Sequence, residues 1–405
     1  MIHLLCHRDF MNEVQVATQV FFPGETFAFV ETVAESGYTV EFSTDTAVVY
    51  NNGTEIARYF FCGEDGEKFL TAKRKAILTV YHALQKAVGA YTPWGALTGI
   101  RPSKLVREWL DCGCDNEEII TALVDVFCCN EKKARLALSV AHAENKLTSV
   151  IAALNQVKHR NPPEMPIGIY ISIPFCPTRC VYCSFNSSQK PPGEFFLEKY
   201  ISALIDEIKK KSSHAKISSI YIGGGTPTFL SEYLLEKLLC AVGSEFDVSN
   251  TTEYTVEAGR PDTLTPAKLK ILRNHNVNRI AVNPQTLNDT TLKSIGRNHT
   301  AADFLKAFSL AREAGFTCIN TDLIAGLSNE TPDDMRRNME VLKKLLPENI
   351  TIHTLAVKRA SVLNERRHEK NLPKQQGANE SSAVESMLSI AAEECAAMGL
   401  SPYYL

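Results

Sequence analysis

The chain contains, at residues 167–183, the sequence IGIYISIPFCPTRCVYC. Its first half is an apolar, β-branched run typical of a strand, in which Tyr170 and Ser172 point to the same face. Its second half places three cysteines on one short loop, with the spacing C-x3-C-x2-C. These are Cys176, Cys180 and Cys183.

Apolar strands of the same kind recur after this segment and alternate with amphipathic helices. The clearest helical face lies within residues 196–208. Repeated β-α units predict a parallel sheet with crossover helices, either a doubly wound layer or a barrel. The expected strands are Ile167–Phe175, Ile217–Gly223, Tyr254–Ala258, Arg279–Gln285, Cys318–Ile324 and Ile350–Val357. The polar candidates fall near the carboxyl ends of these strands, where such sheets place their sites.

The cysteine spacing points to an iron–sulfur cluster. A [4Fe–4S] cluster usually takes four cysteines, so three leave one iron open for a small ligand. Two other interpretations are a zinc site and three core thiols. Zinc sites pair such cysteines with a second, distant pair, and no such pair follows nearby. Pro177 and Arg179 do not suit a buried apolar loop.

Composition narrows the protein class. The chain has 405 residues, 44% of them hydrophobic and 22% charged, with a net charge of −3. These values are ordinary for a globular protein of two or three domains and argue against a nucleic-acid binder. The N-terminus lacks the apolar core of a secretory signal, and no apolar run is long enough to span a membrane. We therefore expect a cytoplasmic protein, whose other cysteines are core or surface thiols.

The region before residue 160 has a different pattern. Residues 1 to about 90 suggest a small α+β unit, with β-rich stretches at Val14–Phe22, Phe27–Val33 and Tyr38–Tyr50 and a helix within Lys68–Val88. Residues 103 to about 157 are predicted helical, with Asn116 and Asn130 as helix caps. A proline-rich linker is expected at Lys158–Pro166 and a loop at Gln189–Gly193.

Three domains follow from this pattern. They are an N-terminal α+β and helical domain (1–160), a β/α core (161–360) and a helical extension (361–405). The apolar ending Tyr403-Tyr404-Leu405 predicts either a C-terminal region that continues beyond residue 405 or a buried chain end.

The cysteine loop at the end of a first strand resembles the radical S-adenosylmethionine (SAM) superfamily. The run GIYISIPFC at 168–176 is similar to the oxygen-independent coproporphyrinogen III oxidase family, and LTGIRP at 97–102 resembles its HemZ branch, the coproporphyrinogen dehydrogenases. The resemblance implies a partial (β/α)6 TIM-like barrel that follows an N-terminal α+β domain. It also implies a [4Fe–4S] cluster on the three cysteines and SAM at the open iron.

The resemblance also implies a set of SAM contacts. The glycine run that ends the second strand would let the backbone approach a ligand closely and offer it free N–H and C=O groups. Arg297 would pair with the SAM carboxylate, Gln285 would contact the adenosyl group, and Ala356 would lie beside the adenine. The full set is Tyr170, Tyr182, Gly224, Gly225, Thr226, Glu257, Gln285, Arg297, Asp322 and Ala356. No catalytic residue is assigned beyond the cluster.

The implied activity is an oxidative decarboxylation. One electron would cleave SAM to a 5′-deoxyadenosyl radical, which would convert coproporphyrinogen III propionates to vinyl groups and give protoporphyrinogen IX for haem synthesis. The implied partners are the porphyrinogen and a flavodoxin- or ferredoxin-like electron donor. The alternatives are a radical SAM enzyme with another substrate, such as a methyl transferase, and a haem-binding chaperone. Phe185 stands where some oxidases have a further cysteine, which leaves the substrate open.

Other clusters are better explained by packing or solvation. They are His3, Cys6 and His7; Cys112 and Cys114; Cys128 and Cys129; and the lysines 209–211. His353, Lys358 and Arg359 flank the end of the sixth strand and could meet substrate propionates or simply lie on the surface.

Overall fold

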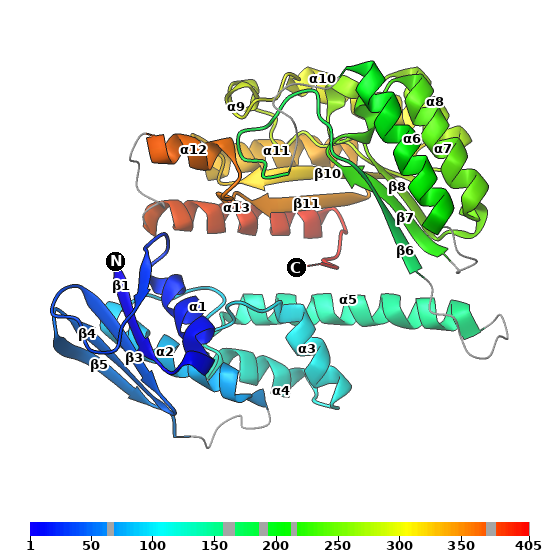
Figure 1. Ribbon diagram of the computed structural model, residues 1–405. Coiled ribbons are helices and arrows are strands. Elements are labelled where there is room, and N and C mark those ends of the chain that lie inside the picture. The colour runs from blue at the N-terminus through cyan, green and yellow to red at the C-terminus, as the bar shows by residue number, and fades with distance from the viewer. Residues whose placement is uncertain (63–68, 157–166, 186–192, 212–216, 370–377, 405) are drawn as a thin grey trace. The chain divides into compact units, whose positions relative to one another are not determined.

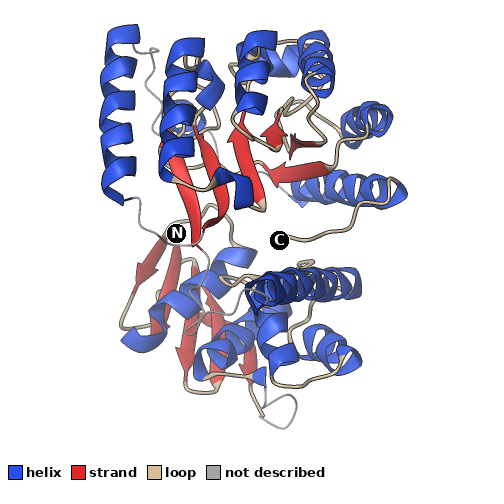
Figure 2. Ribbon diagram, turned by 90° about the vertical axis from the view of Figure 1, so that its right-hand side faces the viewer, coloured by secondary structure: helices blue, strands red, loops and turns tan. Residues whose placement is uncertain are grey.

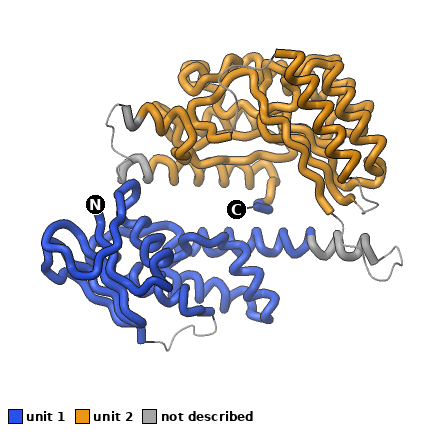
Figure 3. The backbone as a smooth tube through the Cα atoms, viewed as in Figure 1, with its two compact units in different colours: residues 1–159, 373–375, 402–405 blue, residues 160–372, 376–401 orange. Residues whose placement is uncertain are grey.

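The computed structural model describes residues 1–62, 69–156, 167–185, 193–211, 217–369 and 378–404, which form two compact units (Figures 1 and 3). The first unit comprises residues 1–159 with 373–375 and 402–405, and the second comprises 160–372 and 376–401. The predicted linker 158–166 and most of the predicted loop 189–193 lie outside the described residues.

The first unit contains a five-stranded mixed sheet. The strand order is β2-β1-β3-β4-β5, in which β1 runs parallel to β2 and β3, and the remaining pairs are antiparallel. The strands are β1 (Ile2–Cys6), β2 (Phe27–Phe29), β3 (Tyr38–Ser43), β4 (Thr46–Asn51) and β5 (Thr54–Phe60). Helices α1 (Met11–Phe21) and α2 (Ala72–Val88) share a buried core with this sheet.

A helical layer completes the first unit. It consists of α3 (Pro102–Asp111), α4 (Asn116–Thr121), a π-helical turn (Ala122–Val126) and α5 (Glu131–Gln156). Its core gathers around Trp109, Phe127 and Tyr81. Asn130 precedes α5 and its side chain accepts from Lys132, as the predicted cap requires. The cap of α4 is Asp115, which forms a capping box with Glu118, so the prediction for Asn116 was wrong by one residue.

The strand prediction for Val14–Phe22 was wrong, because this stretch lies almost entirely within α1. Val14 and Ala17 are both fully buried and lie three residues apart. A helix places residues at this spacing on one face, whereas a strand would point them to opposite faces. Phe27–Val33 yields only a three-residue strand, and Tyr38–Tyr50 is a hairpin of two strands, β3 and β4. The prediction missed β5.

The second unit is built on a six-stranded, wholly parallel sheet in the order β11-β10-β9-β8-β7-β6. Figure 2 draws the strands in red and the helices around them in blue. Each strand pairs with its predecessor in sequence, with no reversal of order, so the sheet winds in one direction, as in a barrel, and not as a doubly wound layer. The two end strands do not pair, so the barrel is partial. The strands are β6 (Ile167–Ile173), β7 (Ile217–Gly224), β8 (Glu253–Glu257), β9 (Arg279–Ala281), β10 (Cys318–Ala325) and β11 (Asn349–Thr354).

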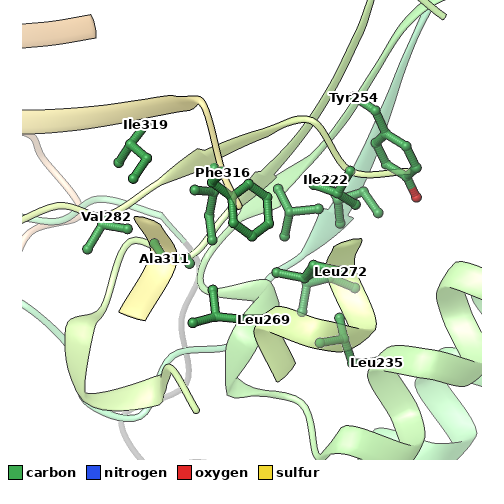
Figure 4. Packing of buried hydrophobic residues seen from close by; sticks show 14 of the residues in the cluster. Ile222, Leu235, Tyr254, Leu269, Leu272, Val282, Ala311, Phe316 and Ile319 are labelled. Atoms are coloured by element: carbon green, nitrogen blue, oxygen red, sulfur yellow. The ribbon is translucent and has the colours of Figure 1, made fainter. Parts of the chain in front are cut away.

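Helices cover the outer face of this sheet. They are α6 (Glu194–Lys211), α7 (Glu232–Glu245), α8 (Pro266–Asn274), α10 (Ala301–Glu313), α11 (Pro332–Leu345) and α13 (Ala378–Ala397). Two shorter helices lie elsewhere: α9 (Asp289–Ser294), whose Leu292 packs with Val181 and Tyr182, and α12 (Val362–Glu369), which follows β11. The outward-facing side chains, such as Ile222, Tyr254 and Ile319, pack with helical residues such as Leu269 and Leu272 in one large core (Figure 4). Met387 of α13 belongs to the same core, so residues after 360 help to cover the barrel.

Every second residue of each strand points away from that core, toward the inner face of the sheet. Many of the residues at these inward positions are polar. Its side chains include Tyr221, Glu257, Asn283, Asp322 and His353, which lie at neighbouring positions around the sheet. None of the described helices is long and apolar enough to cross a membrane.

Candidate functional site

The loop that follows β6, residues 174–185, carries the three predicted cysteine ligands, and we call it the cluster loop. Cys180 is buried, whereas Cys176 and Cys183 are partly exposed. The Cys183 backbone N–H donates to the Cys180 carbonyl at 3.1 Å, which turns the loop back on itself. The Cys176 Sγ lies 3.4 Å from the Thr226 hydroxyl, which joins the loop to the glycine run after β7.

Segments far away in the sequence hold the cluster loop. Four hydrogen bonds connect it to the residues around 295 and to the residues that precede and begin α12. They run from Val181 N to Ile295 O (3.0 Å), from Thr178 Oγ1 to Gly296 O (2.8 Å), from Leu363 N to Val181 O (2.8 Å) and from Arg179 Nη2 to Ala360 O (2.5 Å). The loop conformation is therefore fixed from two sides.

Two buried arginines lie beside Cys180. Arg260 follows β8 and donates from Nη1 to the Cys180 Sγ at 3.8 Å. Arg297 donates from Nη1 to the backbone carbonyls of Gly259 (2.9 Å) and Asn283 (2.7 Å), and its charge acts on both Cys180 and Tyr182. Burial raises the pKa of Tyr182 well above its usual range, while Arg297 opposes that rise. Tyr182 therefore remains a neutral phenol between Cys180 and Arg297.

The glycine run supports the end of β6. A Cβ on Gly225 would come within 2.6 Å of the Phe175 carbonyl oxygen, so only glycine fits there. The N–H groups of Gly225 and Thr226 donate to the carbonyls of Ile173 and Phe175, both at 2.8 Å. These two N–H groups are therefore already paired, and the expected approach of SAM to this run concerns its other backbone groups. The close packing of two strand ends is a sufficient reason for these glycines.

The inner face of β6–β8 carries an acidic and aromatic group. Tyr170 is 61% exposed and stacks on Tyr221, with ring centroids 5.8 Å apart. The Tyr221 hydroxyl donates a short hydrogen bond to the Glu257 carboxylate. Burial raises the pKa of Glu257, and this hydrogen bond partly offsets the rise. Tyr170 and Glu257, two predicted SAM contacts, are thus brought together through Tyr221, which the prediction did not include.

The inner face of β9–β11 carries a second polar group around Asp322. Its carboxylate accepts from the amides of Asn283 (2.8 Å) and Asn320 (2.7 Å), and it pairs with His353 at 3.5 Å. Gln285 has a positive φ of 68°, and its backbone bridges to β10. The side-chain oxygens of Asn283 and Gln285 are buried and have no hydrogen-bond partner within the described residues. A bound ligand with N–H or O–H groups would supply the hydrogen bonds that these two oxygens lack.

The donor set fits the cofactors that the resemblance implies. No three His, Cys, Asp or Glu side chains in the described part of the chain converge on a single metal ion. A cubane cluster does not need such convergence, because each thiolate binds a different iron. Burial raises the pKa of Cys176, but the charge of Arg260 opposes that rise and favours the thiolate that iron requires.

One predicted site residue lies elsewhere than expected, and one residue of the site was missed. Strand β11 ends at Thr354, so Ala356 lies in the loop beyond it and is exposed. Sequence reasoning also missed Arg260, which touches the cluster loop directly. Its signal was an arginine two residues after the predicted strand Tyr254–Ala258, in the run EAGRPD (257–262).

The sequence of this chain is similar to those of several known proteins. Residues 170–342 match the family model of the radical SAM superfamily. The chain is 34% identical over 345 residues to the oxygen-independent coproporphyrinogen-III oxidase-like protein HemZ of Bacillus subtilis, covering 84% of this chain and 66% of that relative. It is 37% identical over 196 residues to the haem chaperone HemW of the same organism, covering 48% of this chain and 51% of that relative.

A solved structure, the coproporphyrinogen III oxidase HemN of Escherichia coli, shares the fold. Its TM-score is 0.52 at 24% identity, and the match covers 61% of this chain and 56% of that one. The chain thus spans about two thirds of the HemZ relative and about half of HemW and HemN.

Proposed function

Residues 170–342 form a radical SAM domain, whose cofactors are a [4Fe–4S] cluster and SAM, and from this premise we propose that the protein is an oxidoreductase that decarboxylates coproporphyrinogen III. The observation that carries the proposal is the similarity to the HemZ relative, which extends over 84% of the chain and so includes the first unit as well as the barrel. The proposed product is protoporphyrinogen IX.

The cofactor residues have distinct tasks in this proposal. The thiolates of Cys176, Cys180 and Cys183 hold three irons. When bound, the cluster and SAM supply the abstraction of a hydrogen atom from the substrate. Glu257 and Asp322 offer carboxylates to SAM from opposite parts of the inner face. The remaining proposed SAM contacts are Tyr170, Tyr182, Gly224, Gly225, Thr226, Gln285, Arg297 and Ala356.

The reaction balances for each propionate. Loss of a hydrogen atom from its β-carbon to the radical derived from SAM, followed by loss of CO₂ and transfer of one electron to an external one-electron acceptor, leaves a vinyl group. Reductive cleavage of SAM separately takes up one electron, and we assign its supply to a flavodoxin- or ferredoxin-like donor. The proposed substrate is anionic. His353 can carry a positive charge, and its hydrogen bond to Asp322 raises the pKa of its imidazole. His353, with the exposed Lys358 and Arg359 beyond β11, gives the substrate carboxylates a basic border.

The test is an anaerobic incubation of the reconstituted protein with SAM, a reductant and coproporphyrinogen III. We expect 5′-deoxyadenosine and vinyl-bearing porphyrin to form together. If 5′-deoxyadenosine forms without any vinyl product, the protein is a radical SAM enzyme with a different substrate. A Cys180→Ala protein serves as the control, because it should form neither product.

A second candidate function is haem binding and delivery. It is favoured by the 37% identity to HemW over half of the chain, a higher identity than that to the HemZ relative. Titration of the protein with haem distinguishes the two functions. Tight, stoichiometric haem binding without turnover of coproporphyrinogen III would favour the chaperone, whereas turnover without haem binding would favour the oxidase.

A further inference from the structure

Arg260 is a buried cation that no expected SAM or cluster contact accounts for. It lies in the turn after β8, and only 2% of its surface is exposed. Burying a guanidinium is costly unless its charge and its N–H groups are satisfied. The groups that its N–H donors contact therefore indicate its role.

The guanidinium divides its donors between one carboxylate and the cluster loop. Nε donates to Asp262 at 3.3 Å. The two other nitrogens point to the loop: Nη1 donates to the Thr178 carbonyl (3.2 Å) and to the Cys180 Sγ (3.8 Å), and Nη2 donates to the Thr178 hydroxyl (2.8 Å). Arg260 thus fixes the residue two positions before Cys180 and also touches the Cys180 sulfur itself.

Arg297 is differently placed, although it lies near the same sulfur. Its Nη1 donates hydrogen bonds to the carbonyls of Gly259 and Asn283, which follow the neighbouring strands β8 and β9. Gly259 immediately precedes Arg260, so Arg297 also steadies the turn from which Arg260 reaches the loop. Both buried cations thus act on Cys180, but Arg297 also interacts with Tyr182 and supports the turn, whereas Arg260 holds Thr178 of the cluster loop as well.

A cation and an N–H donor at a cluster sulfur have a defined electrostatic effect. Hydrogen bonds to the sulfurs and nearby charge are among the factors that set iron–sulfur reduction potentials. A cluster held by three thiolates is anionic and becomes more so when it takes up an electron, so a fixed cation stabilises its reduced form more than its oxidised form. The low exposure of Arg260 leaves this effect little screened by water.

We propose that Arg260 positions Cys180 and raises the reduction potential of the cluster. The inference depends on the radical SAM cofactors and not on the proposed substrate. Arg260 acts through the ligand, so we regard it as a positioning residue. Replacing Arg260 should make the cluster harder to reduce, although the three cysteine ligands are unchanged.

The test compares Arg260→Gln and Arg260→Lys with the unchanged protein, without any substrate. Each protein is reconstituted anaerobically, its iron is counted, and its midpoint potential is measured by redox titration followed by electron paramagnetic resonance. We expect the potential of the Gln variant to shift to more negative values. The Lys variant should fall between the two, because it keeps the charge but loses the planar fork. Arg312→Gln, which breaks a surface pair with Glu348, should leave the potential unchanged.

An unchanged or more positive potential in a cluster-loaded Arg260→Gln protein would overturn the proposal. If that variant folds but fails to keep its iron, the positioning role is supported, and the Arg260→Lys protein then decides the effect on the potential. Folding of each variant without iron is checked by circular dichroism. Because no porphyrinogen is present, failure of this proposal and failure of the oxidase proposal are seen in separate experiments.

Discussion

Asp322 and His353 face each other on adjacent parallel strands, with 3.5 Å between the carboxylate Oδ2 and the imidazole Nε2. Two amides, from Asn283 and Asn320, hold the same carboxylate. The pair therefore presents a fixed carboxylate and a titratable cation side by side on the inner face of the barrel. Both a sugar hydroxyl and an anionic substrate group could be bound there.

The pairing predicts a pH dependence. Because the hydrogen bond to Asp322 raises the folded-state pKa of His353, the charged imidazole stabilises the fold. This contribution is fully present below the unfolded pKa of about 6.5 and is lost as the pH rises through the higher folded value. The side chain is half exposed, so the effect should stay below about 1 kcal/mol. Nuclear magnetic resonance titration of labelled histidines should show the raised pKa, and Asp322→Asn should remove it.

The cluster ligands predict a contrast between two buried cysteines. Cys180→Ala should abolish the brown absorbance and the full iron content after anaerobic reconstitution, because one corner of the cluster loses its ligand. Cys129 is also buried but lies in the first unit, where its Sγ contacts the carbonyls of Pro93 and Asn130. Cys129→Ala should leave the iron content unchanged. A full four-iron cluster in the Cys180→Ala protein would contradict the ligand assignment.

The glycines predict opposite effects on stability. Gly225→Ala should cost about 1–3 kcal/mol, because the new methyl group meets the backbone of Phe175 and must force two strand ends apart. Gly243, in the last turn of α7, has nothing within 4 Å of an added Cβ. Gly243→Ala should therefore stabilise the protein by up to about 1 kcal/mol through helix propensity. Thermal unfolding of the two variants should move in opposite directions, and equal shifts would refute the packing argument.

The two glutamates of β8 predict a difference in SAM affinity. Glu257 and Glu253 point to the same face of the strand, but Glu253 is paired with Arg279 at 2.8 Å. If Glu257 contacts SAM, Glu257→Gln should lose one charge-assisted hydrogen bond, a roughly 10-fold or greater weakening of SAM binding. Glu253→Gln should bind SAM as the unchanged protein does. Calorimetric titration of the cluster-loaded proteins gives both values.

The barrel could be predicted from sequence because its strands are buried on one face and follow one another in simple order. All six predicted strands exist, with ends displaced by a few residues. The largest difference is β9, where the regular strand stops at Ala281 and Gln285 continues only as an isolated bridge to Leu323. Its positive φ takes Gln285 out of the strand pattern, and such a local conformation is not visible in apolar periodicity.

The first unit was harder to predict, because its elements are short and its local preferences conflict with packing. Val14–Phe22 is rich in β-branched and aromatic residues, yet it forms α1 because a helix buries Val14 and Ala17 against α2 and the sheet. Arg260 was missed for a related reason. Its importance comes from contacts with Thr178 and Cys180, about 80 residues earlier, and no local pattern reveals such a contact.

The anchoring of the cluster loop sets an order of events during synthesis. The loop is made with the first strand of the barrel, but its hydrogen bonds run to Ile295, Gly296, Ala360 and Leu363. The ribosome therefore has to complete nearly the whole barrel before the cysteine loop can take its final shape. Iron delivered earlier would meet three thiols on an unanchored chain. Cluster insertion into the loop in its final, anchored shape therefore follows synthesis of the chain as far as Leu363.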